Sequence, residues 1–248
     1  MSDTTAPGTQ PAPATAPAAQ DKTRIRDAAT ILLLRRDMPG GPSVLMGMRG
    51  AGAAFMPSKY VFPGGAVDAD DRLVPLAAPL DAACTARLDQ FAPAGGAAML
   101  AAAAVRELWE ETGLALGARG TWPGAIPDDW AGFAAEGLLP AAGALRFVFR
   151  AITPPGRPRR FDARFFVADA ARVIGDPDDF SRACDELSHL HWVPLHEARR
   201  LNLPFITEVA LAEVAALVEA AGQGPIPPPA SVPFFDNSGP KSIFRRLQ

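Results

Sequence analysis

The chain has 248 residues, of which 48% are hydrophobic and 21% charged, and its formal net charge is −3. These values are typical of a soluble globular protein with one large domain or two small ones. The slight acidic excess argues against a general nucleic-acid binder, which usually carries a basic excess. It still allows a small anionic ligand in a locally basic pocket. Two cysteines, Cys84 and Cys184, are too few for a disulfide framework and lack the spacing of a zinc site.

The two ends of the chain differ in composition from its middle. Fourteen of the first twenty residues are Ala, Pro or Thr, without apolar periodicity, so residues 1–22 are predicted to form a disordered tail. A Pro-rich run at 226–229 predicts an extended carboxyl-terminal tail over 221–248. One domain over residues 23–220 is then expected. With no leader-like start and no apolar run near the ~18 residues that span a membrane, we expect a cytoplasmic protein without a membrane partner.

The first half of this domain begins with strand signals. The apolar stretch 28–34 predicts a buried strand, and the turn residues 39–42 separate it from a second strand at 43–49, which suggests a hairpin. A short strand at 60–65 runs into a pair of glycines. The mixed, alanine-rich segment 73–93 predicts one short helix between loops.

Residues 97–112 have strong helical propensity, and Gly113 fits a cap at the carboxyl end of the helix. An apolar face for the core is formed by Ala98, Ala101, Val105 and Leu108. Glu107, Glu110 and Glu111 follow each other at i, i+3 and i+4, so their like charges repel by about 0.2–0.5 kcal/mol per pair. A divalent cation, which prefers oxygen ligands, would offset this repulsion.

The second half of the domain interleaves helices and strands. In chain order, the predicted elements are a short amphipathic helix at 128–138, strands at 145–152, 160–168 and 187–193, and helices at 194–198 and 205–220. The order lacks the regular alternation of a doubly wound sheet, so a mixed α/β sandwich is predicted.

The segment Arg106-Glu107-Leu108-Trp109-Glu110-Glu111-Thr112-Gly113-Leu114 resembles the second half of the Nudix box, the signature of Nudix hydrolases. Gly65, followed six residues later by Asp71, resembles the first half of the Nudix box, in which the family usually has a glutamate at the position of Asp71. Residues 62–65 are similar to the family's lead-in. Asp71 and Arg106 are 35 positions apart, which leaves an insertion of 27 residues, about 72–98, relative to the family spacing.

The split box is similar to that of one branch of the family, which resembles the mammalian peroxisomal coenzyme A diphosphatases. Residues 49–71, 152–154 and 160–166 are also similar to that branch. The resemblance covers about 23–220. It implies a Nudix-type α/β/α sandwich with a mixed sheet and a helical insertion within the box.

The resemblance also implies a chemistry, the hydrolysis of the pyrophosphate bond in a nucleoside diphosphate derivative with Mg²⁺ or Mn²⁺ as cofactor. Glu107, Glu110 and Glu111 would be the metal ligands, together with the carbonyl oxygen of Gly65. Arg106 would hold a glutamate through a charge-assisted hydrogen bond.

The general base varies within the family, and we expect it outside the box. Glu186, just before the strand predicted at 187–193, is the first candidate. One of His189, His191 and His196 is the alternative.

Three residues near the glycine pair are candidates for substrate binding. Arg49 and Lys59 could contact the phosphates or be ordinary basic surface residues, and Phe55 could either anchor its loop or border an adenine ring.

Three functions are compatible with these residues. The first is hydrolysis of CoA or acyl-CoA, and the second is hydrolysis of a dinucleotide, an ADP-sugar or a nucleoside triphosphate. The third is a non-catalytic nucleotide-binding regulator, against which the complete glutamate triad argues. The expected partner is a small nucleoside diphosphate rather than a nucleic acid, and a homodimer is possible.

Overall fold

The computed structural model describes residues 24–53, 55–92 and 95–248. The tail predicted at 1–22 lies outside these residues. The strands are β1 (Ile25–Arg35), β2 (Ser43–Arg49), β3 (Tyr60–Val61), β4 (Gly64–Ala66), β5 (Gly117–Arg119), β6 (Leu138–Pro140), β7 (Arg146–Ile152), β8 (Arg160–Asp169), β9 (Leu187–Pro194), β10 (Val232–Asp236) and β11 (Ile243–Leu247). The helices are η1 (Ala69–Leu73), α1 (Ala82–Leu88), α2 (Ala97–Thr112), η2 (Asp128–Trp130), α3 (Ala131–Ala135), η3 (Ala170–Arg172), α4 (Leu195–Ala198) and α5 (Phe205–Ala221). In the part of the chain that the structure describes, no helix is long and apolar enough to cross a bilayer.

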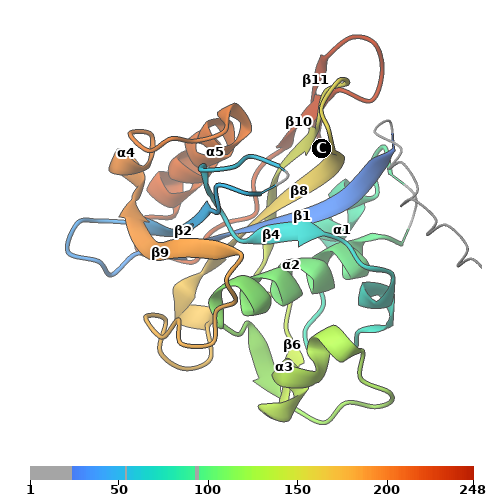
Figure 1. The fold of residues 1–248 in the computed structure, drawn as a ribbon, viewed down its shortest axis with the longest axis vertical. Helices are drawn as coiled ribbons and strands as arrows, with labels where there is room; N and C mark the ends of the chain where they lie inside the picture. Colours follow the sequence, from blue (N-terminus) through green and yellow to red (C-terminus); the bar gives the residue numbers. More distant parts are fainter. Residues whose placement is uncertain (1–23, 54, 93–94) are drawn as a thin grey trace, which may run out of the picture.

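In the described residues, a mixed nine-stranded sheet forms the centre of the molecule (Figure 1). Seven of its strands follow the order β11-β10-β7-β8-β1-β2-β3, and the other two, β4 and β9, pair with β1 and β2. β1 runs parallel to β8 on one edge. Its other edge is shared, because β2 pairs with Leu34 and Arg35 whereas β4 pairs with residues 28–30. β9 pairs with β2, so the sheet divides beside β4. This division lets the glycine pair of β4 meet helix α2.

Helices α2 and α5 cover opposite faces of the sheet (Figure 1). Successive side chains of a strand point to opposite faces. Ile31 and Leu33 of β1 accordingly pack in the core under α2, whereas Leu32 and Leu34 pack in the core under α5. The predicted three-layer α/β sandwich is therefore confirmed.

The elements with strong local signals occur where they were predicted. Helix α2 has the predicted bounds, and Gly113 ends it with φ of +76°. β1 and β2 form the predicted antiparallel hairpin. The helix predicted at 128–138 is observed as η2 and α3 over residues 128–135. Its last three residues are wrong, because α3 ends at Ala135 and residues 138–140 pair with β5 instead. Gly137, with φ of +70°, turns the chain between them.

The extended tail predicted over 221–248 is also wrong. β10 joins the sheet parallel to β7, and β11 pairs with β10 at the sheet edge. The side chains of Val232, Phe234 and Leu247 are buried in the core under α2. Two strands of five residues are too short to show a clear periodicity, so the Pro-rich run at 226–229 dominated the prediction.

The insertion at 72–98 packs against this carboxyl-terminal hairpin. The side-chain amide of Gln90 donates to the carbonyl oxygen of Gln248 at 2.7 Å. Arg150 of β7 donates to the carbonyl oxygens of Gln90 and Phe91, at 2.8 and 3.0 Å. The insertion and the hairpin thus support each other at one edge of the sheet.

If the hairpin belongs to the core, Phe234→Ala should destabilise the fold by about 3–5 kcal/mol, because it leaves a cavity under α2. Phe234 is 1% exposed, and the guanidinium of Arg150 lies 4.2 Å from its ring centroid. Urea unfolding measures the loss. Phe244→Ala is the matched control, because Phe244 is 54% exposed and its loss should cost about 1 kcal/mol or less. Equal costs for the two variants would contradict the prediction.

Candidate active site

Glycines in β4 allow the carboxylates of α2 to approach the sheet. The backbone N–H of Gly64 donates to Glu111 Oε2 at 2.8 Å. A Cβ on Gly64 would lie 2.6 Å from the carbonyl oxygen of Ala29 in β1. A Cβ on Gly65 would lie 2.5 Å from Glu107 Oε1. A side chain at either position would therefore displace the strand or the carboxylate.

Arg106 is the buried cation that joins the two halves of the site. Its Nε and Nη2 donate to the two oxygens of Asp71, each at 3.0 Å. Its Nη1 donates to Glu107 Oε1 and to Glu110 Oε2, each at 2.9 Å, and Nη2 also donates to the carbonyl oxygen of Ala66. The arginine thus holds two glutamates of α2 and an acid that precedes the 27-residue insertion. From the sequence, Asp71 was expected only as the acid in the first half of the Nudix box, and its pairing with Arg106 was not predicted.

The glutamates carry more negative charge than Arg106 can balance. Burial raises the pKa of Glu107 to about 7, although the charge of Arg106 opposes the shift. Burial also raises the pKa of Glu110. The pKa of Glu111 is raised well above 4.5, first by burial and then by the charge of Glu107, with Arg49 opposing. An added cation would relieve this electrostatic cost.

The oxygen atoms of the triad suit a hard cation, although the carboxylates are not yet gathered around one point. Glu111 Oε1 is buried and accepts no hydrogen bond from the described residues. Within residues 24–53, 55–92 and 95–248, no three His, Cys, Asp or Glu side chains are placed to hold a metal ion. Two of the glutamates instead hydrogen bond Arg106. A bound cation would have to draw these carboxylates together.

Glu186 stands beside the triad, directly before β9. Its side chain is 51% exposed, and its Oε1 accepts a hydrogen bond from Arg49 Nη2 at 2.6 Å. The charge of Glu186 contributes to the raised pKa values of Glu107 and Glu111. The structure therefore brings together the three carboxylates, Glu186 and Arg49.

The chain is similar in sequence to known proteins. The chain is 30% identical over 182 residues to putative nudix hydrolase 7 of Caenorhabditis elegans, which is 68% of this chain and 51% of that protein. It is 36% identical over 153 residues to the acyl-coenzyme A diphosphatase NUDT19 of Gallus gallus, which is 47% of this chain and 39% of that protein. The chain thus spans about half, or less, of the length of these relatives. No protein-family model matches it.

Among solved structures, a NUDIX hydrolase from Alicyclobacillus acidocaldarius is 28% identical and superposes with a TM-score of 0.61. The superposition covers 83% of this chain and 99% of that one. The chain belongs to the Nudix hydrolase superfamily. Its fold is the Nudix-type α/β/α sandwich expected from the sequence, and its Nudix box is divided by the insertion at 72–98.

The alternative bases, His189, His191 and His196, have contacts outside the glutamate triad. His191 Nδ1 lies 2.7 Å from the carbonyl oxygen of His189, and its ring packs edge-on against Tyr60 at 5.7 Å. His196 lies 3.7 Å from Glu197. In the described part of the chain, no hydrogen bond joins a histidine to the triad. The charge of Glu186, in contrast, acts on Glu107 and Glu111, so Glu186 is the better placed candidate base.

Lys59 and Phe55 are turned toward other partners than the triad. Lys59 donates to the side-chain oxygen of Asn202 and, at 3.3 Å, to the carbonyl oxygen of Leu203, just before α5. Phe55 packs edge-on against Phe161 of β8 with 5.4 Å between ring centroids. Both contacts fix the loop between β2 and β3. Sequence spacing alone could not reveal these partners, because each lies more than 100 positions away.

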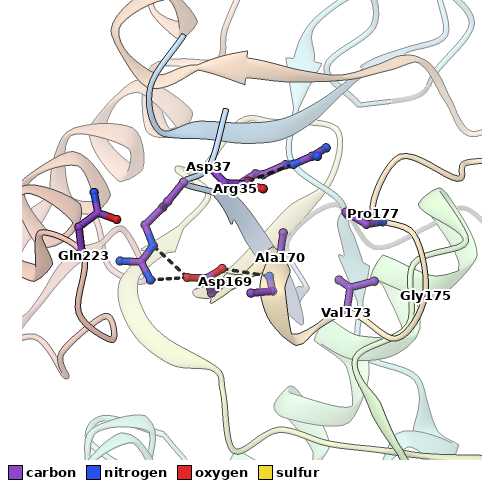
Figure 2. Close-up of a pocket in the computed structure, with 10 residues that line it drawn as sticks. Arg35, Asp37, Asp169, Ala170, Val173, Gly175, Pro177 and Gln223 are labelled. Atoms are coloured by element: carbon purple, nitrogen blue, oxygen red, sulfur yellow. Dashed lines mark hydrogen bonds and ion pairs between the residues drawn. The ribbon is translucent and has the colours of Figure 1, made fainter. Parts of the chain in front are cut away.

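The triad lines neither of two cavities found at the other end of β1. The smaller, of about 380 Å³, lies between the ends of β1 and β8 (Figure 2). There Arg36 donates to Asp169 through Nε and Nη2, at 2.9 and 2.5 Å. Its guanidinium also donates to the carbonyl oxygens of Gly222 and Gly224. These charges are paired within the protein and serve to tie the turn after α5 to the sheet.

Removing the negative charge of Asp71 should destabilise the protein strongly. Asp71→Asn leaves the buried Arg106 without its two-point partner, and breaking such a pair costs about 3–5 kcal/mol. Because Glu107 and Glu110 still contact Arg106, we expect the lower end of that range. Urea unfolding checks this, with Asp70→Asn as control, since the exposed Asp70 should change stability by about 0.5 kcal/mol at most. An unchanged free energy of unfolding in Asp71→Asn would show that the ion pair between Asp71 and Arg106 is not needed for stability.

Without added metal, the protein should lose stability as the pH rises from about 4.5 to about 7. In this window Glu107 is protonated in the folded state and ionised in the unfolded one. The folded state then binds more protons, so the free energy of unfolding falls with rising pH, by about 1.4 kcal/mol for each unit of pKa shift. Urea titrations at pH 5 and pH 8 in a chelator measure the difference. Glu107→Gln, which cannot ionise, should reduce it, and an unchanged pH dependence in that variant would refute the assignment.

Proposed function

We propose that the protein is a metal-dependent hydrolase of the pyrophosphate bond in a nucleoside diphosphate derivative. The observation that carries this proposal is the buried Glu111, whose Oε1 has no hydrogen-bond partner among the described residues and lies in an acidic cluster. A fold gains nothing from burying such a charge unless a ligand compensates it. A half-exposed acid, Glu186, stands next to this cluster.

Glu107, Glu110 and Glu111 would hold Mg²⁺ or Mn²⁺, with the carbonyl oxygen of Gly65 as a further ligand. These are the hard oxygen donors that both ions prefer. When bound, the ion supplies positive charge that neutralises the diphosphate and polarises its phosphorus–oxygen bonds. The raised pKa values of the three glutamates support this role, because a cation favours their ionised forms.

The chain's own residues then prepare the attack of water on phosphorus. Glu186 accepts a proton from the water while the water oxygen forms a bond to one phosphorus of the diphosphate. The bridging phosphorus–oxygen bond breaks, and the leaving phosphate takes the electron pair. A positioned general base of this kind contributes about 10²–10⁴-fold to a rate. Arg106 does not need to touch the substrate, since its hydrogen bonds hold Glu107 and Glu110.

CoA or an acyl-CoA is the substrate that we favour within this class. The similarity to an acyl-coenzyme A diphosphatase supports it, together with the divided Nudix box. Hydrolysis of a dinucleotide, an ADP-sugar or a nucleoside triphosphate is the alternative. A purely nucleotide-binding regulator is disfavoured, because it has no need for three clustered carboxylates, one of which, the buried Glu111, keeps Oε1 without a hydrogen-bond partner among the described residues.

Glu111→Gln should abolish turnover while keeping the protein folded. Glutamine has the same shape but cannot bind a cation as a carboxylate does, so activity should fall by at least about 10²-fold and Mn²⁺ affinity by about 10-fold or more. Without metal the variant should be as stable as the wild type or more so, because it removes a buried carboxyl group whose ionised form is disfavoured by burial. Steady-state kinetics, calorimetric Mn²⁺ titration and urea unfolding test the three points.

Glu219→Gln, an exposed change on α5, is the matched control and should behave like the wild type. Full activity of Glu111→Gln at saturating Mg²⁺ would refute the metal-site assignment.

A substrate panel tests the narrower proposal. CoA, acyl-CoAs, NADH, ADP-ribose and nucleoside triphosphates should be compared with Mg²⁺ and with Mn²⁺. We expect the highest kcat/KM for CoA or an acyl-CoA, with phosphate-containing products separated by chromatography. Equally weak hydrolysis of every compound would exclude the CoA preference without affecting the hydrolase class.

A further inference from the structure

Arg49 and Glu186 meet because β2 and β9 pair in an irregular register. Arg49 is the last residue of β2 and stands opposite Leu187, the first residue of β9. Met46 pairs with His191 and Met48 with Ser188, so β9 contains one residue more than β2 over this interval. His189 takes up the extra residue with φ of +52°. A bulge of this kind redirects the strand and the side chains at its end.

Gly47 makes room for the bulge. A Cβ at this position would lie 2.8 Å from Leu187 Cβ and 3.0 Å from Leu190 Cδ2. The start of β9 therefore approaches β2 more closely than a side chain at position 47 would permit. The approach brings the residue before Leu187, Glu186, within hydrogen-bond distance of Arg49.

Hydrogen bonds hold both the backbone of Arg49 and one nitrogen of its guanidinium. Its backbone N–H donates to the carbonyl oxygen of Lys59 at 3.0 Å, and its own carbonyl oxygen accepts from Ser58 at 3.1 Å. The side chain is only 20% exposed, and its Nη2 donates to Glu186 Oε1 at 2.6 Å. The half-exposed Glu186 would otherwise rotate freely in solvent. In the described part of the chain, its second oxygen, Oε2, accepts no hydrogen bond.

We propose that Arg49 is a positioning residue that holds the carboxylate of Glu186 toward the triad, rather than a ligand of the substrate phosphates. The inference rests on the proposed function, in which Glu186 is the base. Arg49 occupies Oε1 and leaves Oε2 available to the attacking water. The hydrogen bond from Arg49 Nη2 to Glu186 Oε1 joins two charged groups and is therefore of the stronger, charge-assisted kind.

A double-mutant cycle tests this role. Arg49→Ala, Glu186→Gln and the double variant are assayed with the panel compound that the wild type hydrolyses fastest. If Arg49 acts through Glu186, Arg49→Ala should lower kcat by about 10–100-fold with KM within about twofold of the wild type. In the Glu186→Gln background the same change should have little further effect. Arg49→Lys, which keeps a donor, should recover part of the activity.

Two further readouts separate positioning from other roles. Mn²⁺ affinity of Arg49→Ala, measured by calorimetry, should stay within about twofold of the wild type, because the triad is intact. Urea unfolding establishes that each variant is folded. Arg119→Ala is the matched control, since among the described residues the side chain of this exposed arginine donates to the carbonyl oxygen of Glu136 alone; its kcat and KM should not change.

The outcomes distinguish this inference from the function on which it rests. A raised KM with unchanged kcat in Arg49→Ala would overturn the positioning role of Arg49. Losses of kcat that multiply in the double variant would overturn it too, and in both cases the proposed hydrolase function would stand. A wild type that hydrolyses no panel compound would overturn both.

Discussion

The buried ion pair between Arg106 and Asp71 is the interaction on which the site depends. The two residues are 35 positions apart and flank the insertion, so their contact closes a long loop against α2. The same guanidinium contacts Glu107, Glu110 and the backbone of β4. Removing a charge from water costs several kcal/mol, and this cost is repaid only where partners surround it on several sides. Arg106 meets that condition.

The acidic cluster around this arginine is a place where function and stability conflict. Arg106 donates to three carboxylates, whereas the side chain of Glu111 accepts, among the described residues, only the N–H of Gly64. Burial then disfavours the ionised form of each glutamate of the triad. A sequence selected for stability alone would place apolar or neutral side chains here. The conflict is understandable if a cation completes the site.

The parts of the fold that could be predicted are those with a strong local signal. Helix α2 has high propensity, an apolar face and a glycine cap, and its predicted bounds agree with the structure. The hairpin of β1 and β2 follows from two apolar stretches around a Pro-Gly turn. The β10–β11 hairpin could not be predicted in this way. Its stability depends on the burial of Phe234 and Leu247 against distant elements, which short segments do not reveal.

The sequence by itself determined the Nudix box, the length of its insertion and the candidates for metal ligands and base, because their chemistry depends on residue type and spacing along one helix. Only the tertiary structure decided which of these residues are neighbours. Asp71 forms an ion pair with Arg106, Lys59 donates to Asn202, and Arg49 forms an ion pair with Glu186. The physical reason is strand register. A single extra residue at His189 changes which side chains face each other across β2 and β9, and no local pattern in the chain records it.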